Sequence, residues 1–201
     1  MKINPKELNR HQAHDRLTEM VMPRPIAFVS TIGKDGVFNL APYSYFSPLS
    51  NTPMIVGFSI GRKKDGQKKD TLVNIERQKD FVIAVVSESI AHPMVKTAAA
   101  YAIDIDEFEK AGLTPAKADL VAPPLVAESP INMECRLVQI LEFGELPHQN
   151  SFVIGEVVQV HVKDEFITRN QIDALKLKLI GRLGGKGKAY CRTTDIFNIK
   201  R

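Results

Sequence analysis

The feature that most constrains the fold of this chain is a series of short strand patterns, joined by turns, that begins before any long helical pattern. The segment RPIAFVSTI, Arg24 to Ile32, is rich in β-branched and aromatic residues and predicts a strand. GKDG, residues 33–36, is a turn signal, and VFNLAPYSYF, residues 37–46, predicts the returning strand of a hairpin. MIVGFSI, Met54 to Ile60, predicts a third strand. This spacing favours an antiparallel sheet.

Helical patterns are few and lie in the middle of the sequence. DTLVNIERQ, residues 70–78, predicts a short helix with Asp70 as its N-cap, and two further helical patterns lie in residues 87–102 and 104–113. An apolar strand buried on both faces is expected at residues 80–87, and further strands are expected at 131–144 and 151–167. The predicted fold is mainly β, an antiparallel sheet curled into a barrel with peripheral helices.

Length and composition set the broad class of protein. A chain of 201 residues suits a single domain spanning residues 1–201, and 44% hydrophobic with 25% charged residues is ordinary for a globular protein. The apolar runs are too short to span a bilayer and the N-terminus shows no signal-peptide pattern, so we expect a cytoplasmic protein without a membrane partner. Cys135 and Cys191 are expected to be buried free thiols. The net charge of +4 favours anionic ligands.

Several common catalytic motifs can be excluded. GRKKDGQK, beginning at Gly61, has Gln67 where a P-loop needs its lysine, and GRLGGKGKAY does not have the spacing of a dinucleotide fingerprint. His11 and His14 have no third ligand nearby in the sequence, so no metal site is expected. HExxH and GxSxG are absent from the sequence. The sequence therefore gives little support for hydrolytic chemistry.

Uncharged polar residues and a basic run together suggest a binding site. Ser30 and Thr31 end the first predicted strand, and NLAPYSYFSPLS, residues 39–50, combines hydroxyls, aromatic rings and two prolines without any charge. RKKDGQKKDT, residues 62–71, brings cations to the start of a helix, which is a favourable place for an anion. A phosphate-bearing aromatic cofactor would match both parts. The alternative is that the rings belong to the core and the basic run is a solvated loop.

Six blocks extend this pattern along the chain and carry a family resemblance. In order they are PRPIAFVSTIGKDGVFNLAPYSYFSPLS, KKDTLVNIERQKDFVIAVVS, DEFEKAGLTP, APPLVAESPINMECRL, GEVVQVHV and GRLGGKGKAY. Between about Met22 and Tyr190 the sequence resembles the flavin reductase-like family of FMN-binding split barrels, which contains flavoredoxin and the flavin-reductase components of two-component monooxygenases. The resemblance implies a Greek-key split barrel, a homodimer, and FMN bound without a covalent link near the subunit interface.

The resemblance also implies which residues bind the cofactor. Those expected to border the isoalloxazine ring and ribityl chain are Ser30, Thr31, Asn39, Ala41, Pro42, Tyr43, Ser44 and Phe46. Those expected at the phosphate are Arg62, Lys69, Asp70 and Thr71. Those of the C-terminal block expected to close over the site are Arg182, Gly184, Gly185 and Tyr190. This block departs from the family pattern by an additional KGKA, residues 186–189.

Three functional hypotheses follow. The first is an FMN-dependent oxidoreductase that transfers electrons from NADH or NADPH to free flavin or another acceptor. The second is a flavoredoxin-like electron carrier whose FMN is reduced by a protein partner. The third is a nucleic-acid-binding barrel, which the absence of tryptophan and of aromatic residues within the basic runs disfavours. Because a flavin supplies its own redox chemistry, the first two need no catalytic side chain.

Overall fold

The computed structural model describes residues 1–185, 187 and 189–199. The strands are, in chain order, β1 (Ala27–Ile32), β2 (Phe38–Tyr43), β3 (Phe46–Asn51), β4 (Met54–Ile60), β5 (Asp80–Ala84), β6 (Pro115–Ala116), β7 (Leu125–Val126), β8 (Ile131–Phe143), β9 (Asn150–Val162), β10 (Ile167–Thr168), β11 (Gln171–Ile172), β12 (Ile180–Arg182) and β13 (Tyr190–Arg192). The helices are η1 (Pro5–Glu7), α1 (Arg10–Met20), α2 (Asp70–Gln78), η2 (Glu88–Ile90), α3 (Ala91–Lys96), α4 (Glu107–Ala111), η3 (Asp164–Phe166) and α5 (Ala174–Leu177).

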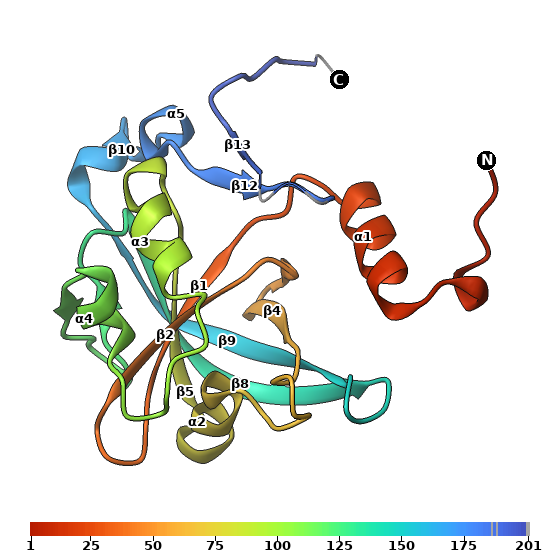
Figure 1. The fold of residues 1–201 in the computed structure, drawn as a ribbon. Coiled ribbons are helices and arrows are strands. Elements are labelled where there is room, and N and C mark those ends of the chain that lie inside the picture. The colour runs from red at the N-terminus through yellow and green to blue at the C-terminus, as the bar shows by residue number, and fades with distance from the viewer. Residues whose placement is uncertain (186, 188, 200–201) are drawn as a thin grey trace.

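Seven strands form one antiparallel sheet in the order β2-β1-β5-β8-β9-β4-β3. Strands β5, β8 and β9 make a meander, and β4 lies beside β9 although α2 connects it to β5 (Figure 1). This is Greek-key connectivity. The prediction of a mainly β fold with peripheral helices is confirmed.

The two edge strands of this sheet follow each other directly in the sequence. β2 ends at Tyr43 and β3 begins at Phe46, yet they lie at opposite edges of the sheet. The sheet must therefore curl so that its two edges approach each other at Ser44 and Tyr45. The Ser59 backbone N–H donates to the Tyr45 carbonyl at 2.9 Å, which extends the pairing of β3 with β4 by one residue. The expected single strand over residues 37–46 was wrong in this respect, because the chain changes direction at Ser44 and Tyr45 and continues on the other edge.

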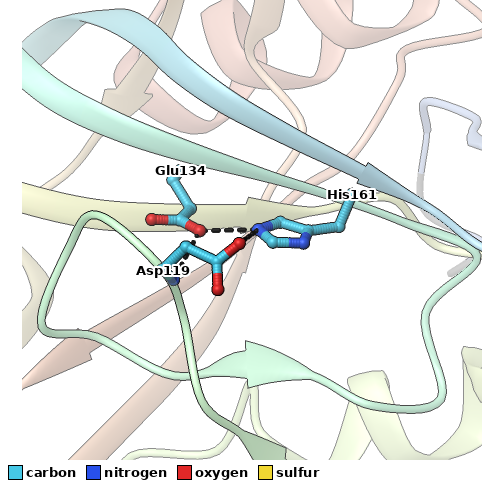
Figure 2. A group of neighbouring side chains, drawn as sticks. All are labelled: Asp119, Glu134 and His161. Carbon is cyan, nitrogen blue, oxygen red and sulfur yellow. Dashed lines mark hydrogen bonds and ion pairs between the residues drawn. The ribbon is translucent and has the colours of Figure 1, made fainter.

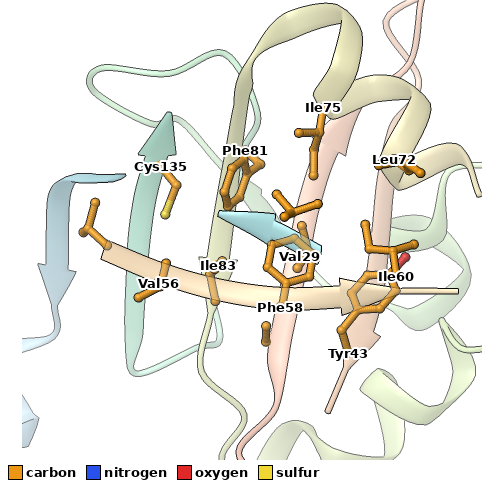
Figure 3. Close-up of a cluster of buried hydrophobic side chains, with 13 residues drawn as sticks. Val29, Tyr43, Val56, Phe58, Ile60, Leu72, Ile75, Phe81, Ile83 and Cys135 are labelled. Atoms are coloured by element: carbon orange, nitrogen blue, oxygen red, sulfur yellow. The ribbon is translucent and has the colours of Figure 1, made fainter. Parts of the chain in front are cut away.

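The main core fills the inside of the curled sheet. Figure 3 shows β4 crossing it, with Val56, Phe58 and Ile60 packed against residues of β1, β5 and α2. Helix α2 closes one end of this core with Leu72 and Ile75. Alternate residues of β1 and β5 face this core, and the residues between them pack into clusters on the outer side, so both strands are buried on both faces, as expected for β5.

Helices α3 and α4 cover the outer face of β1 and β2, where Phe28 and Leu40 pack against Met94 and Phe108 (Figure 1). Helix α1 projects from this body instead of covering the sheet. It was not predicted from the sequence, since it buries only Thr18 and shows little apolar periodicity. The sequence feature that could have predicted α1 is the capping box formed by Asn9 and Gln12. No helix in the described part of the chain is both long and apolar enough to cross a membrane.

Candidate functional site

A cavity of about 560 Å³ lies along the open edge of β2, between the start of α2 and the segment that follows α3. Glu107 of α4 also lines it. Eight of the residues predicted from the sequence lie in its wall: Asn39, Ala41, Pro42, Tyr43, Arg62, Lys69, Asp70 and Thr71. Pro42 has no backbone N–H to offer a further strand, which suits its place on an edge. The cavity therefore joins the uncharged strand to the basic run.

One end of the cavity is cationic. The Arg62 side chain is only 3% exposed, and one of its terminal nitrogens donates to Glu142 at 3.1 Å and to Gln149. Its Nε and Nη1 atoms are buried and have no hydrogen-bond partner among the residues that the structure describes. Buried donors of this kind are costly unless a ligand accepts from them. Arg62 is therefore suited to bind an anion in the cavity.

The start of α2 adds backbone donors to the same end. Lys69 is the N-cap, and no side chain among the described residues caps the helix, so the expected capping role of Asp70 was wrong. Asp70 instead pairs with Lys63 at 2.8 Å. The first N–H groups of a helix have no acceptor within it, and their partial positive charge favours an anion. Burial lowers the pKa of Lys69, whose Nζ lies 5.6 Å from the centre of the Tyr43 ring.

The floor of the cavity is a hydrogen-bond network centred on Asn39. Its Oδ1 accepts from the hydroxyls of Thr31 at 3.0 Å and Thr71 at 2.8 Å. Thr71 accepts in turn from the Tyr43 hydroxyl at 2.9 Å. Burial raises the pKa of Tyr43 above its usual range, so its phenol remains a donor at neutral pH. The four side chains are thereby held in one orientation between β1, β2 and α2.

A carboxyl group completes this network from α4. Glu107 accepts from the Asn39 amide at 2.9 Å and from the Leu40 backbone N–H at 3.1 Å, so it fixes the edge of β2. It is 8% exposed. Burial raises the pKa of Glu107 to about 7, although the two hydrogen bonds from β2 oppose this effect. The sequence patterns gave no role to Glu107, because the contact joins residues that lie far apart in the chain.

A second cavity, of about 530 Å³, lies next to the first and shares Pro42, Ala98 and Ala99 with it. Its wall contains three more of the predicted residues: Ser44, Arg182 and Tyr190. The Arg182 guanidinium lies over the Tyr190 ring, 4.7 Å from its centre. The rest of the wall is mainly apolar. This second space is thus suited to a planar group with negative charge nearby.

Arg24 links several segments around the second cavity. The sequence patterns did not identify this role. Its side chain donates to the carbonyls of Thr18, Val21 and Leu183 at 2.8, 3.0 and 3.3 Å. Its backbone also pairs with that of Arg182. Arg24 therefore joins α1 and the C-terminal block to the start of β1.

Five predicted residues line neither cavity: Ser30, Thr31, Phe46, Gly184 and Gly185. Thr31 acts through Asn39, and Ser30 is fully buried in the sheet. Phe46 packs against the main core. Gly184 lies against α1, where a Cβ atom would come within 2.0 Å of the Thr18 carbonyl oxygen. Of the additional KGKA segment, Lys186 and Lys188 lie outside the described residues.

One group of three potential metal ligands occurs in the described part of the chain, away from both cavities. Figure 2 shows Asp119, Glu134 and His161 with their side chains turned toward one another. The buried Glu134 carboxylate accepts from the backbone N–H groups of residues 119–121 and lies 2.6 Å from His161 Nε2. Both carboxylate oxygens are thus already engaged, and the group anchors the loop before β7 to the sheet.

Comparison with known proteins places the chain in a family. Residues 19–174 match the family model described as flavin reductase like domain. Nitrilotriacetate monooxygenase component B from Bacillus cereus is 34% identical, with a TM-score of 0.93 over 99% of this chain and 98% of that chain. The 2-nitrobenzoate 2-nitroreductase of Pseudomonas fluorescens is 32% identical, with a TM-score of 0.89 over 100% of this chain and 96% of that chain. The chain therefore belongs to the flavin reductase-like family.

The fold agrees with this assignment. A protein from Shewanella frigidimarina NCIMB 400 with a split barrel domain is 24% identical, and the two structures align with a TM-score of 0.82 over 98% of this chain and 96% of that chain. At this level of identity the likeness concerns the fold alone. The split barrel predicted from the sequence blocks is confirmed.

Proposed function

We propose that the protein is an FMN-binding oxidoreductase that passes electrons from NADH or NADPH through the bound flavin to free flavin or another acceptor. The observation that carries this proposal is the cavity of about 560 Å³, which joins a cationic end to the uncharged edge of β2. When bound, FMN itself supplies the two-electron redox chemistry. The protein has to bind it, orient it and control its surroundings.

The residues at the cationic end fit a phosphate. The Nε and Nη1 atoms of Arg62 are buried donors without a partner among the described residues, and Lys69 and Thr71 lie at the uncapped start of α2. We expect Arg62, Lys69 and the first N–H groups of α2 to hold the phosphate through charge-assisted hydrogen bonds. Asp70 keeps Lys63 at the mouth of the cavity by the ion pair between them.

The edge of β2 fits the ring and ribityl chain. Asn39, Ala41, Pro42 and Tyr43 present a wall without charge along the cavity. The hydrogen bonds among Asn39, Thr71 and Tyr43 keep these groups in place before a ligand arrives. The adjoining cavity, with Arg182 and Tyr190, provides room for a nicotinamide donor or a second flavin beside the first.

The visible spectrum of the purified protein, with and without added FMN, tests this proposal. We expect bound FMN, and rapid bleaching when NADH or NADPH is added under anaerobic conditions. A protein that neither contains nor binds FMN would contradict the assignment of the cavity. Binding without bleaching by either nucleotide would contradict the nicotinamide-dependent reaction and favour the electron carrier.

We also propose that the protein is a cytoplasmic homodimer. Helix α1 projects from the barrel and exposes Leu17 and Met20, and the neighbouring Val21 and Met22 are exposed as well. Leu49 of β3 and Met54 of β4 expose further apolar surface. Apolar groups on a projecting helix gain stability when a second subunit covers them. Sedimentation velocity at micromolar concentration would detect the dimer.

A further inference from the structure

Glu107 is a buried acid in the wall of the first cavity that electron transfer through a flavin does not use. It is held between α4 and β2 by the Asn39 amide and the Leu40 N–H. Both hydrogen bonds are donated to the carboxyl group, which leaves other lone pairs free. Through Asn39 it also fixes the hydroxyl of Thr71, at the start of α2. The charge of the Glu107 carboxylate therefore acts on any ligand in the first cavity.

Charged groups from several elements share this cavity with Glu107. The loop after β4 contributes Arg62, Lys63, Lys64 and Asp65, and the start of α2 contributes Lys69 and Asp70. Tyr43 of β2 and Tyr101, which follows α3, are the titratable groups on the other sides. The charge of Asp70 already raises the pKa of Glu107. An anion bound at the start of α2 also raises the pKa of Glu107.

We propose that Glu107 is a proton-coupled positioning residue: when a phosphate-bearing ligand enters the cavity, Glu107 takes up one proton from solvent and continues to hold Asn39 and Leu40 as a neutral acid. The proton occupies a free lone pair of the carboxylate, so no bond to β2 has to break. The acid then no longer repels the phosphate. This inference rests on the proposed function, because it takes FMN as the ligand.

The coupling has a defined sign. Without ligand the pKa of Glu107 is raised to about 7, and a bound dianion raises it further. Binding therefore takes up protons in the window that begins near pH 7 and extends to the pKa of the complex. Affinity falls as the pH rises through that window, by about tenfold for each unit of pKa shift. Below the window Glu107 is protonated in both states and has no effect.

Calorimetry of the unaltered protein is the first test. FMN is titrated at pH 7.5 in two buffers with different heats of ionisation, and riboflavin serves as the probe without a phosphate. At this pH a phosphate monoester is almost fully dianionic, since its second pKa is about 6, so the ligand binds no proton of its own. We expect net proton uptake with FMN and markedly less with riboflavin. Equal uptake for both ligands would overturn the coupling to phosphate.

The second test separates Glu107 from Lys69, whose lowered pKa also favours proton uptake when an anion binds. Glu107→Gln retains Lys69, so it is expected to lose the share of proton uptake due to Glu107 and to flatten the pH dependence of FMN affinity between pH 6.5 and 8.5. Glu109→Gln, at an exposed position on the same helix, is the matched control and should behave like the unaltered protein.

Each outcome has one meaning. If FMN binds but Glu107→Gln and the unaltered protein show the same proton uptake and pH profile, the role of Glu107 is overturned while the proposed function stands. If FMN does not bind the unaltered protein, the proposed function itself fails. If Glu107→Gln does not fold, Lys69→Met takes its place, because it removes the other group that takes up a proton. Proton uptake with FMN that persists in Lys69→Met supports Glu107, and uptake that disappears overturns its role.

Discussion

At the scale of the residue, hydrogen-bond direction organises the cavity. Asn39 Oδ1 accepts from two hydroxyls, so its amide group must point to Glu107. Thr71 donates to Asn39 and accepts from Tyr43, which leaves its backbone N–H at the start of α2 for a ligand. One altered side chain in this chain of contacts therefore leaves a buried partner without its bond.

The double variant Lys69→Ala with Thr71→Val tests the phosphate end. We expect FMN affinity to fall by at least about tenfold. Lys69→Ala removes a charge-assisted hydrogen bond worth about 1.5–3 kcal/mol, and Thr71→Val breaks the contacts to Asn39 and Tyr43 that orient the start of α2. Fluorescence quenching of FMN measures the loss. Lys68→Ala is the control, since Lys68 is exposed and pairs with Glu76 outside the cavity. Unchanged affinity in the double variant would contradict the assignment of the phosphate.

Glu134 is predicted to stabilise the fold in a pH-dependent way. Burial alone would raise the pKa of Glu134, but the bonds from residues 119–121 and from His161 together lower it. Its contribution is therefore present above the unfolded pKa of about 4.3 and is lost as the pH falls further. Glu134→Gln should lower the free energy of unfolding at pH 7 by about 1.5–3 kcal/mol and remove part of the acid sensitivity.

Urea unfolding at pH 7 and pH 3 measures both effects for Glu134→Gln. Glu128→Gln is a suitable control, because Glu128 is half-buried and, within the described part of the chain, accepts only the Thr114 N–H. Equal losses of stability at both pH values would contradict the ionised state of Glu134.

The residues that sequence patterns found and missed differ in one physical respect. Asn39, Lys69 and Thr71 lie in segments whose composition already suggests binding, and all three line the first cavity. Glu107 and Arg24 owe their roles to partners across the fold: Glu107 bonds to β2, 67 and 68 residues away, and Arg24 to Leu183, 159 residues away. Local periodicity contains no information about such partners.

At the scale of the element, predicted and observed bounds agree where the local pattern decides the structure. Strand β4 spans Met54–Ile60 and helix α2 spans Asp70–Gln78, as the apolar spacing predicts. The break between β2 and β3 was not predictable in this way, because it depends on β3 pairing with β4 at the far edge of the sheet. Both halves of the segment retain strand character, so the pattern alone gives no sign of the turn.

Arg24→Met tests how the peripheral elements are attached. Without the guanidinium, α1 and the segment around Leu183 lose the donors that join them to β1. We expect a broad-specificity protease to cleave within residues 1–23 several-fold faster, while the barrel fragment persists. Arg16→Met is the control, since Arg16 is exposed and pairs with Glu19 on the same helix. Unchanged cleavage, followed by mass spectrometry, would contradict this role of Arg24.

At the scale of the whole molecule, the proposed dimer makes a direct prediction. Placing a charge at Leu17 or Met20, as Leu17→Asp or Met20→Asp, adds the cost of burying that charge to the association. We expect the dissociation constant of the dimer to rise by at least about tenfold, which corresponds to about 1.4 kcal/mol. Sedimentation equilibrium measures it. Variants that associate as well as the unaltered protein would exclude α1 from the interface.

The order of strands in the sheet also bears on how the protein is made. The residues that line the first cavity all lie between Asn39 and Glu107. Yet β4, which leads into the cationic loop, is joined to the rest of the sheet through β9, and β9 ends at Val162. During synthesis on the ribosome, all lining residues are therefore present in the nascent chain long before β9 exists to fix β4 in the sheet. If the cavity binds a cofactor as proposed, we expect binding only after β9 has been synthesised.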